Sequence, residues 1–234
     1  MSSIAENVKS IKQRVAEAAV RSGRVPEDVR LCAATKMNDA SRVREAIAAG
    51  VDICGENRVQ ELSEKFEQGA YEGCPLHFIG HLQTNKIKYM VPYVAMIHGI
   101  DSYKLLTEVN KQAAKVNRVI KCLIQLHIAQ EETKFGFSAE ECREMLAAGE
   151  WKHLDNVQIC GLMGMATNTD NIEQIKAEFR SLNNFFQEAK ATWFSNAEWF
   201  RELSMGMSHD YHEAIAAGST LVRVGSKIFG ERIY

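Results

Sequence analysis

Lys36 follows an apolar run at 29–35 (VRLCAAT), and an amine at the end of a buried strand can point into the cleft that neighbouring strand ends frame. An amine held against apolar surroundings loses part of its preference for the charged form, so it can attack an aldehyde and form a Schiff base. A solvated loop lysine is the ordinary alternative. The other residues that share the cleft decide between the two interpretations.

Two segments near the end of the chain, 203–208 (LSMGMS) and 221–226 (LVRVGS), place small residues and hydroxyls after strand-like runs. We expect Ser208 to open a helix, where its hydroxyl and the unpaired backbone N–H groups favour an anion. Gly225 lets the backbone approach a phosphate closely, and Ser226 adds a hydroxyl. Taken singly, a plain helix cap and an everyday turn remain open. An aldehyde-trapping lysine and a phosphate cradle together predict pyridoxal phosphate.

Arg223 alternates with Val222 and Val224, so its side chain points opposite to theirs. If the two valines face a helical layer, the guanidinium faces the cleft. A pyridine nitrogen would accept a hydrogen bond from it there, whereas the alternative partner is a carboxylate such as Asp52 or Glu56.

Further polar groups follow other strand-like runs. Glu56 and Asn57 come after the second, His81 after the third, and Met163 ends the sixth. His81 could orient or stack on a ring, or it could be a structural histidine. Lys134 follows the fifth run as a second amine, which could relay an aldehyde or simply be solvated.

His209 and His212 have the H-x-x-H spacing of some metal sites. No third ligand accompanies them, so we predict no metal.

The elements that must position these residues alternate between strand-like and helical patterns. An amphipathic helix with apolar residues at helical spacing covers 4–18. Later helices carry end signals: 39–49 closes at Gly50, Ser138 and Glu141 form a capping box, and 208–217 closes at Gly218. The strand-like runs are 29–35, 51–54, 76–79, 94–98, 119–128, 157–163, 203–205 and 220–224.

Eight strand–helix units of roughly 30 residues are what a (β/α)₈ barrel requires, whereas a doubly wound open sheet usually has fewer strands. We therefore predict a TIM barrel with an additional N-terminal helix, in one domain over 1–234. In such a barrel the functional groups gather at the carboxyl ends of the strands, and phosphate is often held after strands seven and eight.

Composition is that of a globular protein that handles small molecules. Apolar residues make up 46%, charged residues 25%, and the net charge is −2, so neither a nucleic-acid-binding stripe nor a membrane-binding basic segment is indicated. The N-terminal residues lack the apolar stretch of a secretory signal, and no run is long enough to span a bilayer. Six scattered cysteines without C-x-x-C spacing are interpreted as reduced core thiols of a cytoplasmic protein.

Read together, these residues resemble the YggS-like pyridoxal-phosphate homeostasis protein family, which is itself similar to the barrel domain of alanine racemase. The match runs nearly end to end. Its carrying segments are ATK at 34–36, GENRVQE at 55–61, HFIGHLQTNK at 77–86, GLM at 161–163, LSMGMS at 203–208 with Asp210, and VRVG at 222–225 with IFG at 228–230.

The resemblance implies that Lys36 carries the cofactor as an internal aldimine, that Ser208, Gly225 and Ser226 take the phosphate, and that Arg223 meets the pyridine nitrogen. This sequence departs from the family pattern at three positions. Arg58 stands where tyrosine is usual, and Ser226 and Gly164 stand where threonine is usual. Glycine at 164 cannot make any contact that the family makes through that hydroxyl.

The resemblance also implies a cofactor carrier or buffer, with apo-forms of pyridoxal-phosphate-dependent enzymes as partners. An arginine opposite the pyridine nitrogen disfavours its protonation and weakens the ring as an electron sink. We also expect a monomer, because the site draws every group from one chain. The alternatives are a weak amino-acid racemase or transaminase that uses Lys36 as base, and a cofactor-free phosphosugar isomerase.

Overall fold

The computed structural model describes residues 3–131 and 135–230. Eight parallel strands pair in chain order and close into a barrel, with β8 hydrogen-bonded to β1. The strands are β1 Arg30–Ala34, β2 Ile53–Glu56, β3 Leu76–Phe78, β4 Met96–Ile100, β5 Ile120–Leu126, β6 Val157–Gly164, β7 Glu202–Ser204 and β8 Leu221–Val224. Each overlaps its predicted run, so the predicted TIM barrel is confirmed.

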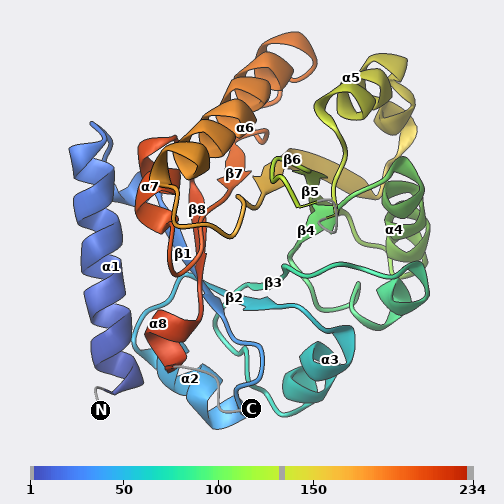
Figure 1. The fold of residues 1–234 in the computed structure, drawn as a ribbon. Coiled ribbons are helices and arrows are strands. Elements are labelled where there is room, and N and C mark those ends of the chain that lie inside the picture. The colour runs from blue at the N-terminus through green and yellow to red at the C-terminus, as the bar shows by residue number, and fades with distance from the viewer. Residues whose placement is uncertain (1–2, 132–134, 231–234) are drawn as a thin grey trace.

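Helices surround the strands (Figure 1). The α-helices are α1 Ile4–Arg21, α2 Ala40–Ala48, α3 Val59–Glu67, α4 Tyr103–Lys115, α5 Ala139–Ala148, α6 Ile172–Thr192, α7 Tyr211–Ala216 and α8 Ser226–Phe229. Three 3₁₀ segments, η1 Pro26–Asp28, η2 Thr84–Tyr89 and η3 Glu150–His153, complete the described elements. The third unit therefore carries η2 where the other units have an α-helix. The predicted additional helix is α1, which packs beside α2, α7 and α8 (Figure 1).

Local sequence signals account for most helix ends. The side chain of Asp39 accepts the N–H of Arg42 at the start of α2. Ser138 and Glu141 form the predicted reciprocal capping box of α5, with bonds of 3.1 and 2.8 Å. Gly50 and Gly218 follow their helices with φ values of +95° and +105°, a conformation that glycine adopts without a steric penalty.

The prediction that Ser208 opens a helix is wrong. Residues 208–210 form a turn, and α7 begins at Tyr211. Asp210 holds this turn, because its side chain accepts the N–H of Met207 at 2.6 Å. The hydroxyl of Ser208 is thereby left to contact a different segment, the loop after β8.

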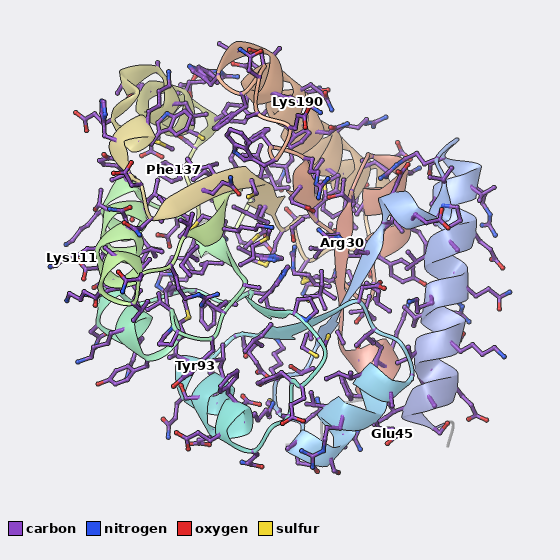
Figure 2. All side chains as sticks on the ribbon, turned by 180° about the vertical axis from the view of Figure 1, so that it is seen from behind. Arg30, Glu45, Tyr93, Lys111, Phe137 and Lys190 are labelled. Carbon is purple, nitrogen blue, oxygen red and sulfur yellow. The ribbon has the colours of Figure 1, made fainter. Side chains whose placement is uncertain are left out.

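The main core lies between the strands and the helices, while two small apolar clusters fill the barrel interior. The interior side chains are Met96, Leu123, Cys160 and Met163 in one cluster, and Cys32, Ile53 and Leu221 in the other. Charged side chains such as Lys111 and Lys190 lie on the outer helices (Figure 2). All six cysteines are free thiols, as predicted. Within the described ranges, no helix has the length and apolar character needed to cross a membrane.

Candidate functional site at the barrel mouth

A cavity of about 220 Å³ opens among the carboxyl ends of the strands and brings together five of the predicted site residues. These are Lys36, Asn57, His81, Met163 and Arg223. Its remaining lining is Ala34, Ile79, Gly80, Gln125, Phe135, Met165 and Met207. We call it the mouth cavity. Apolar side chains thus surround a small number of polar groups, as in most small-molecule sites.

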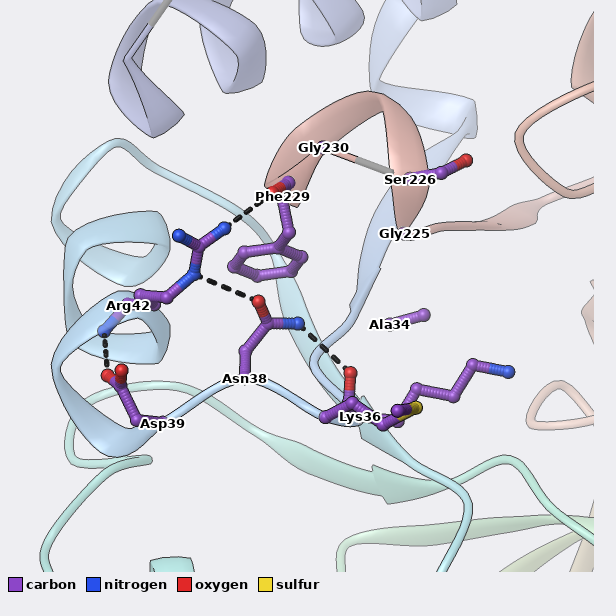
Figure 3. Close-up of a pocket in the computed structure, with 10 residues that line it drawn as sticks. Ala34, Lys36, Asn38, Asp39, Arg42, Gly225, Ser226, Phe229 and Gly230 are labelled. Atoms are coloured by element: carbon purple, nitrogen blue, oxygen red, sulfur yellow. Dashed lines mark hydrogen bonds between the residues drawn. The ribbon is translucent and has the colours of Figure 1, made fainter. Parts of the chain in front are cut away.

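A second cavity of about 260 Å³ adjoins the first and shares Ala34 and Lys36 with it. Gly225 and Ser226, two of the predicted phosphate residues, line this loop cavity. Figure 3 shows Arg42 and the Phe229 ring on one side of it, with the Lys36 side chain extending away from them. Lys36 therefore stands between a cavity that contains Arg223 and a cavity that contains the Gly-Ser segment.

The backbone on both sides of Lys36 is held by α3. The ammonium group of Lys65 donates to the Thr35 carbonyl at 2.8 Å, and the carboxylate of Glu61 accepts the N–H of Met37 at 2.5 Å. Lys65 also bonds to Glu61 at 2.6 Å, which ties the two supports together. The backbone that carries Lys36 is thus hydrogen-bonded to α3 on both sides.

Glu56 also contacts the segment that carries Lys36, but from a buried position. It does not lie on the rim, where the sequence predicts it. It is fully buried, and its Oε1 accepts from Lys65 at 2.8 Å, from the Thr35 hydroxyl at 2.6 Å and from the Tyr71 hydroxyl at 2.9 Å. Burial raises the pKa of the Glu56 carboxyl, and the adjacent Lys65 ammonium partly offsets that rise.

Ser208 lines neither cavity, yet it contacts the loop that does. Its hydroxyl accepts the backbone N–H of Gly225 at 3.2 Å. A Cβ at position 225 would lie 3.3 Å from the Ala34 Cβ, so glycine allows the loop after β8 to lie close to the end of β1. The predicted phosphate residues are therefore adjacent, with the Ser208 hydroxyl bonded to the backbone between Arg223 and Ser226.

Arg223 is buried, and it contacts neither of the carboxylates considered from sequence. Its guanidinium donates to the Ser204 hydroxyl at 2.6 Å and to the Gly164 carbonyl at 3.4 Å. Asp52 instead bonds to Lys12 and to the backbone of Leu31, so the carboxylate alternative is wrong. Burial lowers the pKa of Arg223 from its ordinary value.

A chain of buried polar groups continues from Arg223 through the barrel. Ser204 Oγ lies 3.0 Å from His98 Nδ1, and His98 Nε2 lies 2.9 Å from His77 Nδ1. Burial lowers the pKa of His77 to about 3 and that of His98 well below its ordinary value, so both imidazoles are neutral at pH 7. Both histidines hydrogen-bond within this chain. The chain holds the Ser204 hydroxyl in place, and that hydroxyl in turn holds the Arg223 guanidinium.

His81 stands at the rim of the mouth cavity in a defined orientation. Its Nδ1 lies 3.1 Å from an Asp101 oxygen, and its ring stacks on Phe135 with centroids 3.6 Å apart. Asn57 is held close by, because a Cβ on Gly80 would come within 2.4 Å of the Asn57 carbonyl oxygen. Both residues lie where the sequence placed them.

Sequence reasoning missed Gln125 and Phe135. Gln125 is nearly fully buried, lines the mouth cavity and donates to the Phe135 carbonyl at 2.9 Å. A polar residue inside the apolar run at 119–128 was the available signal. Nothing in the local pattern marked Phe135.

Two of the three departures from the family pattern, Gly164 and Arg58, line neither cavity, whereas Ser226 lines the loop cavity. A Cβ on Gly164 would meet Leu182 at 2.7 Å and Ile128 at 3.0 Å, so a side chain there would point toward the helical layer. Arg58 is exposed, precedes α3 and lines neither cavity. Lys134 lies outside the described residues.

The H-x-x-H pair does not act as one unit. His209 lies 3.4 Å from Asp210, whereas His212 packs against the Tyr211 ring. In the part of the chain that the structure describes, no group of three His, Cys, Asp or Glu side chains could hold a metal ion. The absence of a metal stays a prediction.

This arrangement suits a ligand with three distinct parts. An amine can bond to a carbonyl carbon, Ser226 and the Gly225 loop offer hydroxyl and backbone groups for an anion, and a buried guanidinium can donate to a ring acceptor. The apolar lining of the mouth cavity suits the ring itself.

Comparison with known proteins identifies the family. The family model described as "Alanine racemase, N-terminal domain" matches residues 1–233. A curated protein named pyridoxal phosphate homeostasis protein from Aquifex aeolicus is 37% identical over 230 residues, covering 98% of each chain. Its Escherichia coli K12 namesake is 36% identical over 238 residues, covering 100% of this chain and 99% of its own. The solved structure of PipY from Synechococcus elongatus with PLP bound superposes with a TM-score of 0.80 at 32% identity, covering 97% of this chain and 100% of PipY. The chain belongs to the family of the alanine racemase N-terminal domain.

Proposed function

We propose that this protein binds pyridoxal 5'-phosphate at the barrel mouth and carries or buffers it, with Lys36 as the covalent attachment point and no substantial turnover. The observation that carries the proposal is the position of Lys36, shared by a cavity that contains Arg223 and one that contains Gly225 and Ser226. The named relatives and PLP-bound PipY support the same cofactor.

Different residues would bind different functional groups of the cofactor. Ser208, Gly225 and Ser226 would hold the phosphate. The Lys36 amine would bond to the aldehyde, and this reversible bond is the chemistry that the cofactor supplies.

The ring would lie among Asn57, His81 and Met163, with its nitrogen toward Arg223. Arg223 has only hydrogen-bond donors, and Ser204 and the Gly164 carbonyl fix its position. Such a group keeps a facing pyridine nitrogen unprotonated, which favours binding over catalysis of amino-acid reactions.

The lining of the mouth cavity also argues against fast turnover. None of the described residues that line it is a tyrosine or a carboxylate that could work opposite Lys36 as a second acid or base. A carrier needs only reversible attachment, so we further propose that apo-forms of cofactor-dependent enzymes in the cytoplasm receive the cofactor from a monomeric protein.

One observation favours the alternative of a weak racemase or transaminase. His81 is an imidazole on the cavity rim that pairs with Asp101, and its side chain is 40% exposed. An imidazole that a carboxylate holds at one nitrogen is oriented to exchange a proton at the other. His81 is therefore the residue that would assist Lys36 if turnover is found.

The test is to load the protein with pyridoxal phosphate, reduce it with borohydride and map the labelled peptide. We expect the label on Lys36, none on Lys36→Met, and unchanged labelling of Lys111→Met, whose side chain is exposed on α4. A label confined to another lysine would refute the attachment.

Turnover is tested separately by incubating the loaded protein with an apo-aminotransferase and with amino acids followed by chiral analysis. Cofactor transfer without racemisation supports the carrier. Multiple turnovers at the ~1–10³ per second of ordinary enzymes would favour the enzyme alternative.

A further inference from the structure

Two cysteines that the proposed function does not use lie in contact in the core between the strands and the helices. The Sγ of Cys54, on β2, lies 3.6 Å from the Sγ of Cys74, in the segment before β3. The N–H of Cys54 donates to the Pro75 carbonyl at 2.9 Å, and the N–H of Cys74 donates to the Tyr71 carbonyl at 3.0 Å. The main chain therefore already holds both residues together, and a disulfide requires the sulfurs to approach by only about 1.5 Å.

The two thiols differ in reactivity. Cys74 is partly exposed, whereas Cys54 is fully buried. The hydrogen bond from the Cys54 thiol lowers the pKa of Cys74 below its ordinary value, and the same bond together with burial raises the pKa of Cys54. Cys74 is thus the thiol that ionises more easily and that a small oxidant can reach.

The remaining cysteines are shielded from this chemistry. All four are buried, and burial raises the pKa of each thiol. They are Cys32 and Cys142, each raised to about 12, Cys160, raised to about 11, and Cys122. Oxidation should therefore begin at Cys74 and stay within the pair.

We propose that Cys54 and Cys74 form a reversible redox pair that hydrogen peroxide closes. The Cys74 thiolate attacks one peroxide oxygen, the O–O bond breaks, and water leaves once a proton is taken up, giving a sulfenic acid. The Cys54 sulfur then attacks the Cys74 sulfur, the S–O bond breaks, and a second water leaves as the disulfide forms. Two electrons pass from the thiols to the peroxide, and a dithiol reverses the reaction by exchange.

Closure would act on the support of Lys36, although the redox chemistry itself does not depend on the cofactor. The disulfide would join the ends of a loop that contains the whole of α3, Val59–Glu67. This helix supplies Glu61 and Lys65, which bond to the backbone on either side of Lys36. A disulfide that closes this loop should reduce the movement of α3 away from the backbone beside Lys36.

The primary experiment uses the unmodified full chain. Reduced protein is treated with equimolar hydrogen peroxide, remaining thiols are alkylated, and peptides are mapped by mass spectrometry. We expect loss of two of the six thiols, a cross-linked peptide joining Cys54 to Cys74, and full recovery with dithiothreitol. Conversion of Cys74 to sulfinic acid while Cys54 remains alkylatable would overturn the proposal.

Variants separate the pair from general oxidation. Cys74→Ser should keep all its remaining thiols under the same treatment, and Cys142→Ser, altered on α5, should form the cross-link as the unmodified chain does. Equal thiol loss in Cys74→Ser and the unmodified chain would refute the role of Cys74. For the consequence at Lys36, amide exchange in the 35–38 segment should be slower in the oxidised protein, and equal exchange in both forms would refute that part.

Discussion

Replacing Lys65 by methionine should destabilise the protein because it leaves a buried carboxylate without its ammonium partner. Lys65 is 6% exposed and donates to Thr35, Glu56 and Glu61 at 2.6–2.8 Å. Removing one member of a buried ion pair typically costs about 3–5 kcal/mol. Glu56 can take up a proton in response, so we expect a loss near the lower limit, about 3 kcal/mol at pH 7, measured by urea denaturation.

The pH dependence distinguishes this mechanism from simple loss of packing. The pKa of Glu56 is already raised above its ordinary 4.5, and losing Lys65 raises it further. Between 4.5 and the raised pKa, the folded state binds more protons than the unfolded chain, so stability falls as pH rises through that interval. The deficit of Lys65→Met relative to the unmodified chain should therefore be larger at pH 8 than at pH 5.

Two further variants complete the test. Adding Glu56→Gln to Lys65→Met removes the buried charge and should restore about 1–2 kcal/mol at pH 8. Lys111→Met breaks only an exposed pair with Glu108 and should change stability by less than about 0.5 kcal/mol. If Lys65→Met stays within about 1 kcal/mol of the unmodified chain at pH 8, the pair does not stabilise the Lys36 segment as argued.

Three other predictions concern pH, cofactor affinity and backbone conformation. The pKa of buried His77 is about 3. Below about pH 6.5 the unfolded chain therefore binds a proton on this histidine that the folded state does not bind, so the free energy of unfolding falls as the pH drops toward 3. Lowering the pH from 6.5 to 5 should cost the unmodified chain about 1.6 kcal/mol more than His77→Gln in urea titrations, and equal slopes would contradict the buried neutral imidazole. Replacing Ser208 and Ser226 together by alanine should weaken pyridoxal phosphate binding by about 1.5–3 kcal/mol for each lost hydrogen bond, and unchanged affinity in fluorescence titration would place the phosphate elsewhere. Gly161→Ala should lose more than about 4 kcal/mol or fail to fold, because a Cβ there would lie 1.8 Å from a backbone oxygen, whereas Gly23→Ala, with nothing within 4 Å, should cost only about 1–2 kcal/mol by thermal melting.

The barrel could be predicted because residues close together in sequence mark where each strand and helix begins and ends. Apolar runs bounded by glycine and capping residues located every strand, and a barrel then requires the residues after those strands to share one rim. Lys36, Asn57, His81, Met163 and Arg223 were found in this way and line one cavity.

The missed features depend on contacts between segments distant in sequence. Glu56 looked like a rim residue, yet Lys65, Thr35 and Tyr71 hold it in the buried layer, and these pairings carry no local pattern. Ser208 looked like a helix cap because it precedes a helical run, but the Asp210 carboxylate accepts the N–H of Met207 and holds 208–210 in a turn, so the helix begins only at Tyr211. Tertiary hydrogen bonds overrode the local signal in both cases.

The buried chain through the barrel has a preferred direction. Arg223 can only donate, so the Ser204 oxygen accepts from it and keeps its own proton for His98 Nδ1. His98 then carries its proton on Nε2 and donates to His77 Nδ1, which leaves the His77 proton on Nε2. The opposite order would leave the Ser204 proton without an acceptor among the described residues. One cation at the mouth thereby selects the tautomer of two imidazoles that lie deeper in the barrel.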